Sequence, residues 1–190
     1  MKRLLSMAKA FALLAVLVIF AAGAGLAEEN LFAYGDFEGK WKQIDAKATS
    51  PEGWTPRANN YDLIGPAGDI KYEGATALHV VTSAKSGAQV LNSVGVPVQE
   101  GTTYIVGYWV YVTDGGIRMS VVDNTEPRFY PVFNKHHFAT DFEPGEWQYH
   151  EIEFVPPKGC KQLRLSLVQS TEREVKRTAA YFDKIVVRVK

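Results

Sequence analysis

The stretch TYIVGYWVYV, from Thr103 to Val112, is the clearest strand in this chain. Its side chains form two alternating sets, because successive residues of a strand point to opposite faces of the sheet. One set is Tyr104, Val106, Tyr108, Val110 and Val112, and the other is Ile105, Gly107, Trp109 and Tyr111. The first set predicts the core side, and the second places two aromatic rings on the opposite face. The turn Asp114-Gly115-Gly116 then ends the strand.

The same alternation recurs along the chain, separated by turn residues. It predicts further strands over residues 76–82, 88–98, 117–123, 147–155, 162–169 and 180–189. No helix is predicted after residue 27, so the fold class is all-β, an antiparallel sandwich or barrel. The segment 124–146 is aromatic, interrupted by prolines and predicted to be a long loop, a kind of segment that is often functional.

The first 27 residues have the pattern of a secretory signal peptide. Lys2, Arg3 and Lys9 precede an apolar run, and small residues follow it up to Ala27. Cleavage after Ala27 is predicted, with cleavage after Ala24 as the second choice. An uncleaved anchor is the alternative, although the apolar core is short for a spanning helix, which needs about 20 apolar residues. The expected location is secreted or periplasmic, with one domain over residues 28–190.

Charge and cysteine content narrow the function classes. The chain has 21 Lys+Arg and 21 Asp+Glu, and removal of the three basic residues of 1–27 leaves 18 against 21. This balance argues against a nucleic-acid-binding protein, which usually carries a concentrated basic surface. The single Cys160 cannot form an intrachain disulfide. It is a free surface thiol, an intermolecular link or an inert buried residue, and the last is favoured.

A set of short landmarks occurs in order from Asn30 to Lys190. They are Asn30-Leu31-Phe32, Gly35-Asp36-Phe37-Glu38, Gly53-Trp54, Tyr72-Glu73-Gly74, Glu100-Gly101-Thr102-Thr103-Tyr104, Gly145-Glu146-Trp147 and Tyr181-Phe182-Asp183. No single landmark is specific, but the ordered set resembles the carbohydrate-binding modules of the 4/9, 16 and 22 type. The resemblance implies a jelly-roll β-sandwich of two antiparallel sheets, with a glycan in a cleft on the concave sheet.

The resemblance also implies a structural calcium ion that ties the N-terminal strand to the C-terminal one. The matching positions are Glu38 and Asp183, with backbone carbonyls near Asn30 and Tyr72 completing the shell. Calcium takes six to eight hard oxygen ligands, so this donor set is compatible with it. The alternative is that Asp183 only bonds backbone and Glu38 is solvated.

Glycans present apolar C–H faces and hydroxyl rims, so their sites combine aromatic rings with polar side chains that form directional hydrogen bonds. Trp109 is the strongest candidate platform, with Tyr111 on the same face, unless a loop covers the indole. The other candidates for ligand contact are Arg118, Gln89, Gln169 and Tyr130. Trp54 is expected to be structural. The adjacent His136 and His137 would point to opposite sides of a strand, which disfavours zinc.

These features predict a secreted, non-catalytic protein that binds a polysaccharide or oligosaccharide. Glu151 and Glu153 share a strand face at a separation compatible with a glycosidase pair, but solvated strand residues explain them as well. The second hypothesis is a cell-envelope or surface interaction protein with the same fold and no sugar binding. A diverged hydrolase or lyase is a third, weaker one.

Overall fold

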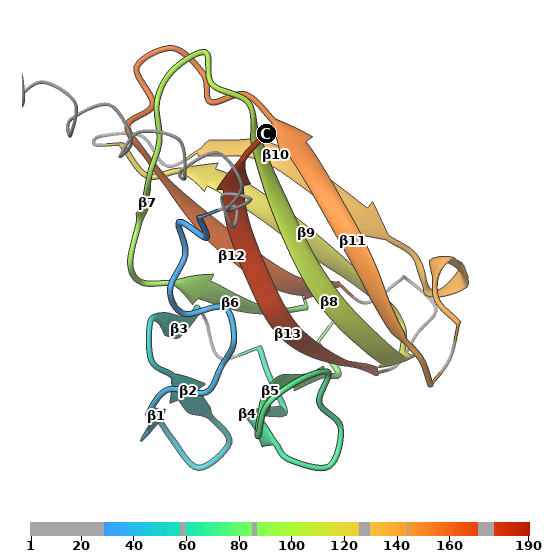
Figure 1. The fold of residues 1–190 in the computed structure, drawn as a ribbon. Coiled ribbons are helices and arrows are strands. Elements are labelled where there is room, and N and C mark those ends of the chain that lie inside the picture. Colours follow the sequence, from blue (N-terminus) through green and yellow to red (C-terminus); the bar gives the residue numbers. More distant parts are fainter. Residues whose placement is uncertain (1–28, 58–59, 85–86, 126–129, 144, 171–176) are drawn as a thin grey trace, which may run out of the picture.

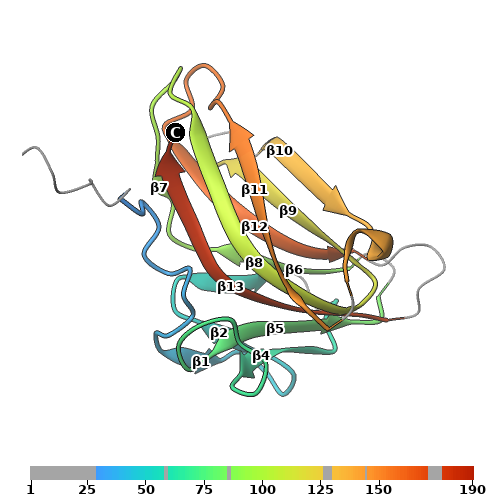
Figure 2. The same ribbon diagram turned by 45° about the vertical axis from the view of Figure 1, so that its right-hand side comes forward.

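The computed structural model describes residues 29–57, 60–84, 87–125, 130–143, 145–170 and 177–190. They form a jelly-roll sandwich of two antiparallel sheets (Figure 1), with β8, β11 and β13 in the front layer and β9 and β12 behind it. The first sheet has the strand order β11-β8-β13-β5-β4, and the second has the order β10-β9-β12-β6-β3, with β7 beside β12. The 45° turn in Figure 2 shows the same two layers.

The bounds of the elements are as follows. The five-stranded sheet contains β4 (Leu63–Ala67), β5 (Ala77–Thr82), β8 (Tyr104–Asp114), β11 (Trp147–Phe154) and β13 (Thr178–Val189). The six-stranded sheet contains β3 (Trp54–Arg57), β6 (Ala88–Asn92), β7 (Val96–Pro97), β9 (Gly116–Asp123), β10 (Tyr130–His137) and β12 (Gln162–Ser170). A small hairpin pairs β1 (Trp41–Gln43) with β2 (Thr49–Pro51), and the 3-10 turn η1 covers Ala139–Asp141.

The core lies between the sheets and follows the alternation expected from the sequence. Its buried residues include the predicted inward set of β8, with Ile117, Met119 and Val121 of β9 and Leu163, Leu165 and Leu167 of β12. Trp54 is also buried, and its indole N–H donates to the carbonyl of Tyr34 at 2.8 Å. The predicted fold class and the structural role of Trp54 are therefore confirmed.

Two parts of the strand prediction were wrong. The segment 124–146 is not one long loop, because β10 pairs with β9 inside it and η1 follows. Its prolines are compatible with a strand here because β10 is an edge strand, and the pairing is irregular between Pro131 and Phe133. The run 88–98 is two strands, β6 and β7, rather than one. The short strands β1 to β4 were not predicted.

The N-terminal segment is tied to β13. The Asn30 carboxamide oxygen accepts from the backbone N–H groups of Phe32 and Val187, both at 3.0 Å. The Leu31 N–H donates to the Val187 carbonyl at 2.7 Å, and the Ile185 N–H donates to the Gly35 carbonyl at 2.9 Å. The first described residues are thus held against the last strand by direct hydrogen bonds.

Candidate functional site

Small polar residues form a row across the outer face of the six-stranded sheet. Ser120 of β9 and Ser166 of β12 are cross-strand partners, and Asn134 of β10 lies opposite Ser120 on the other side. The Ser120 hydroxyl donates to the Asn134 carboxamide oxygen at 2.6 Å. Gln89 of β6 donates from its amide nitrogen to the Ser166 hydroxyl, also at 2.6 Å. The row is therefore a hydrogen-bonded polar strip on a β-sheet face.

Two arginines flank this row from opposite ends. Arg118 lies two residues before Ser120 on β9, and Arg164 lies two residues before Ser166 on the antiparallel β12. Both side chains are half-buried, and the Nε atom of each is buried with no hydrogen-bond partner in the part of the chain that the structure describes. We call the surface formed by Gln89, Arg118, Ser120, Asn134, Arg164 and Ser166 the polar face.

A buried Nε–H donor without a partner is costly, because it has lost water and gained no acceptor among the described residues. The guanidinium carries five donors in a planar fork that matches a carboxylate or a pair of hydroxyls. The two serines between the arginines are buried, Ser120 at 4 % and Ser166 at 0 % exposure, so a ligand would meet Arg118, Arg164, Gln89 and Asn134 rather than the hydroxyls. The polar face therefore has the chemistry of a site for a hydroxyl-rich or anionic ligand.

The structure divides the sequence-predicted ligand residues between two opposite faces. Arg118 and Gln89 lie on the polar face. Gln169 pairs with Ala88 and Ile117, and Tyr130 begins β10, but the side chains of Gln169 and Tyr130 lie outside the described part. Trp109 and Tyr111 project from β8 on the outer side of the five-stranded sheet. These residues cannot all contact one ligand at one surface.

Trp109 and Tyr111 belong to a layer of rings that we call the aromatic face. It consists of Tyr72, Trp109, Tyr111, Trp147, Tyr149 and Tyr181. Tyr72, on the loop of residues 68–76, stacks on Trp109 with ring centroids 3.7 Å apart, and Tyr149 lies 5.3 Å from the same indole. One side of the Trp109 ring is thus covered by a loop, so the rings first of all stabilise one another.

Sequence reasoning missed Arg164, Ser120, Ser166 and Asn134. Arg164 and Ser166 stand in the outward set of the predicted strand 162–169, so their face was available from the alternation. What the sequence lacked was the pairing of β12 with β9, which brings the two serines together. Asn134 was hidden because its strand was taken for a loop.

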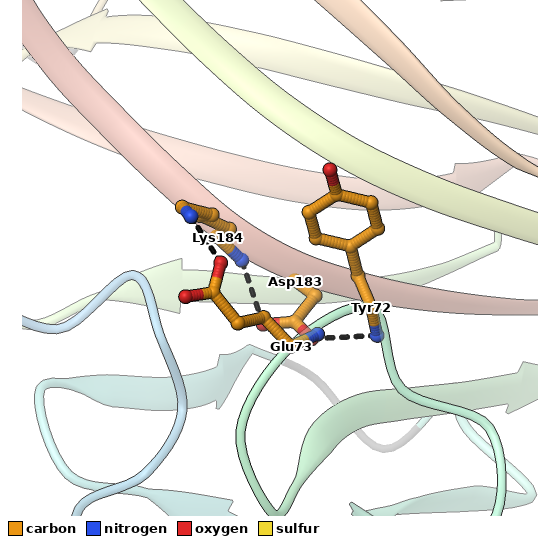
Figure 3. Close-up of polar contacts among 4 residues, drawn as sticks. All are labelled: Tyr72, Glu73, Asp183 and Lys184. Atoms are coloured by element: carbon orange, nitrogen blue, oxygen red, sulfur yellow. Dashed lines mark hydrogen bonds and ion pairs between the residues drawn. The ribbon is translucent and has the colours of Figure 1, made fainter.

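The two predicted calcium ligands, Glu38 and Asp183, both contact the loop of residues 68–76, and Figure 3 shows the contacts of Asp183. Asp183 is 1 % exposed, and its carboxylate accepts from the N–H groups of Tyr72 at 2.9 Å, Glu73 at 3.2 Å and Lys184 at 2.7 Å. Glu38 accepts from Ala75 at 2.8 Å and Thr76 at 2.9 Å. Burial raises the pKa of Asp183, and the nearby charge of Glu38 acts in the same direction. Carboxylates from near both ends of the described chain therefore hold the loop that carries Tyr72.

The oxygen chemistry of this region fits calcium. Glu38 and Asp183 line one pocket of about 170 Å³ together with Asp36 and Glu73. The ammonium of Lys184 also lines it and pairs with Glu73, as Figure 3 shows. Within the described ranges, no three His, Cys, Asp or Glu side chains converge closely enough to hold a metal ion, so carbonyl or water oxygens would have to complete the shell. Asn30 does not line this pocket.

Other reactive groups are held in structural contacts. Glu151 bonds Arg188 at 3.0 Å and Glu153 bonds Lys190 at 2.7 Å, so each carboxylate has its own cation. Cys160 is buried, which raises the pKa of its thiol to about 11 and keeps it protonated at neutral pH. This agrees with the inert role favoured from the sequence.

A histidine pair is packed beside the core. His137 bonds the Tyr108 hydroxyl at 2.7 Å, and its ring centroid lies 4.2 Å from that of His150. The Nε2 atom of His150 is buried without a hydrogen-bond partner among the described residues. Burial lowers the pKa of His150, and the charge of Lys135 adds to the effect while Asp141 opposes it.

This pair predicts acid sensitivity. A histidine with a lowered folded pKa is more readily protonated in the unfolded chain, so its contribution to stability is full above about pH 6.5 and falls as pH drops below that value. We expect His150→Gln to reduce the loss of unfolding free energy between pH 7.5 and pH 5.5. Urea unfolding at both pH values measures it. An identical pH dependence in the variant and the wild type would show that His150 contributes nothing.

Comparisons with known proteins agree with this architecture. Solved structures similar to the chain include "Family 16 Carbohydrate Binding Module-2" (18% identity, 83% of this chain and 99% of that chain, TM-score 0.55). They also include the CBM22-1 xylan-binding domain from Paenibacillus barcinonensis Xyn10C (17%, 85% and 95%, 0.56) and TmCBM61 in complex with beta-1,4-galactotriose (14%, 85% and 99%, 0.55). At these identities the likeness shows the fold. A search of curated proteins gave no match.

The fold defines the class of this chain, a jelly-roll β-sandwich module. More specifically, the family model CBM_4_9, described as "Carbohydrate binding domain", matches residues 29–172. The chain belongs to this family, which confirms the resemblance seen in the sequence. Across the described residues, no helix is long and apolar enough to cross a membrane.

Proposed function

We propose that this chain is an exported, non-catalytic protein that binds a polysaccharide or oligosaccharide through the polar face. The observation that carries the proposal is the pair of half-buried arginines, Arg118 and Arg164, on either side of the serine row, whose buried Nε atoms have no hydrogen-bond partner among the described residues. The family supplies the ligand class. Similar structures include a xylan-binding domain and a complex with a galactotriose, which are glycan ligands of those proteins.

The polar face offers each kind of group that a sugar hydroxyl needs. Guanidiniums donate, and the carboxamides of Gln89 and Asn134 donate and accept, while the buried serine hydroxyls hydrogen-bond those two carboxamides. Hydrogen bonds that involve a charged partner are the stronger ones, so Arg118 and Arg164 would contribute most of the polar affinity.

The ion pairs of Glu151 and Glu153 and the lowered pKa of Glu151 support a binding role without catalysis. Glu151 and Glu153, the pair with glycosidase-like spacing, lie on β11 at the edge of the other sheet and are each ion-paired. A general acid needs a raised pKa, whereas hydrogen bonds from Tyr149 and Arg188 lower the pKa of Glu151.

The proposal includes export and calcium. Residues 1–27 would be removed as a signal peptide, placing the domain in the periplasm or outside the cell. Calcium would be held by the carboxylates of Glu38 and Asp183, where it would tie β13 to the loop of residues 68–76. If so, removing calcium with a chelator should lower the melting temperature of the protein, and restoring calcium should recover it. An unchanged melt would count against the metal.

The test is binding of residues 28–190 to a panel of soluble and insoluble polysaccharides with calcium present. We expect specific retention on one glycan class. If a folded protein binds none of them, the proposal is wrong. The second hypothesis, an envelope interaction protein, would then gain, with the exposed Tyr72 and Tyr149 of the aromatic face as its first candidate contacts.

A further inference from the structure

The charged side chains of the polar face, Arg118 and Arg164, are both positive. Arg118 and Arg164 have no ion pair, hydrogen bond or ring contact among the described residues, although both are half-buried. The outward register positions of β3, β6, β9, β10 and β12 contain no Asp or Glu. This is unexpected in a chain whose Lys+Arg and Asp+Glu counts are equal.

The opposite sheet shows what an ordinary charged strand surface looks like in this protein. There Arg188 of β13 pairs with Glu151 of β11, and Lys190, which follows β13, pairs with Glu153 of β11. Cations on that face have their counter-ions within the protein. Among the described residues no carboxylate pairs with Arg118 or Arg164, so these two arginines could accept an anion from outside the protein.

We propose that the ligand of the polar face is an acidic glycan, a polymer whose sugar units carry carboxylate groups. This inference rests on the proposed function. A carboxylate accepts two parallel N–H bonds from one guanidinium, which is the strongest pairing that arginine makes. Arg118 and Arg164 are four register positions apart, about 13 Å along the strands at the usual rise per residue. The register therefore places the backbones of the two arginines at opposite ends of the serine row, within reach of one extended polymer.

The experiment compares one polymer in two charge states. Binding of residues 28–190 is measured by titration calorimetry against polygalacturonate, the same polymer fully methyl-esterified, and neutral xylan, at low and high salt. We expect polygalacturonate to bind at least about tenfold more tightly than its ester, with affinity falling as salt screens the charges. Dextran sulfate, a sulfated polymer, tests which anionic group the protein recognises. If the protein bound it more tightly than polygalacturonate, the assignment of the ligand's charged group as a carboxylate would be overturned.

Variants distinguish binding at the polar face from general electrostatic attraction between the protein and an acidic polymer. The double variant Arg118→Gln with Arg164→Gln should remove the preference for the acid form, whereas Lys158→Gln, which deletes an exposed cation from a turn, should keep it. Equal binding of the acid and the ester would overturn the acidic ligand and leave the proposed function standing. No binding to any glycan would overturn the proposed function itself.

Discussion

Replacing Arg118 by alanine should weaken glycan binding by about ten- to a hundredfold and leave the melting temperature nearly unchanged. The variant removes charged hydrogen-bond donors worth about 1.5–3 kcal/mol in the complex. It removes no partner from the protein, because the guanidinium has none among the described residues. Calorimetric titration with the glycan selected by the panel gives the affinity, and a thermal melt gives the stability.

The matched control is Trp109→Ala on the opposite sheet. The sequence alone favours Trp109 as the sugar platform, but Tyr72 stacks on its ring at 3.7 Å. We therefore expect Trp109→Ala to lower the melting temperature and to retain most of the glycan affinity. The reverse pattern, with affinity lost in Trp109→Ala and kept in Arg118→Ala, would move the binding site to the aromatic face and refute the polar face.

Replacing Asp183 by alanine should destabilise the protein by about 3 kcal/mol or more. The carboxylate is buried and accepts from three backbone N–H groups, two of them on the loop of residues 68–76. Each buried donor left without an acceptor costs about 1–3 kcal/mol. Urea unfolding in the presence of a chelator measures this effect separately from any metal.

Two further variants test the cause of that loss. Asp183→Asn keeps a carbonyl acceptor and removes a charge whose burial raises the pKa of the carboxyl, so its loss should be clearly smaller. Asp36→Ala removes a carboxylate that lines the same pocket and is exposed, and should change stability little. If all three variants were equally stable, the hydrogen bonds of Asp183 would not hold the loop.

The side chains of each strand that point inward could be predicted from the sequence, because the alternation of inward and outward side chains depends only on neighbouring residues. The inward set of residues 103–112 and the leucines of 162–169 were placed correctly for that reason. Alternation does not say which sheet a strand joins. Trp109 and Arg118 both point away from the core, and only the long-range pairing shows that their strands belong to opposite layers.

The remaining errors have similar causes. β10 is an edge strand with an irregular register, and its proline, Pro131, imitates a loop residue. The loop of residues 68–76 carries no strong pattern, yet two distant carboxylates position it over Trp109. Its cover over the indole was therefore not visible until the chain was folded.

The position of β13 in its sheet determines when the five-stranded sheet can form. This strand follows the other described strands in the sequence, and it lies in the middle of the five-stranded sheet, between β8 and β5. Until it arrives, β4 and β5 have no connection to β8 and β11 within that sheet, while the strands that carry the polar face are all present. Contacts such as Asp183 with Tyr72 span 111 residues, and contacts that close such long stretches of chain form slowly. Without β13, the five-stranded sheet has two open edges, on β8 and β5, and open edges of this kind can pair with other chains.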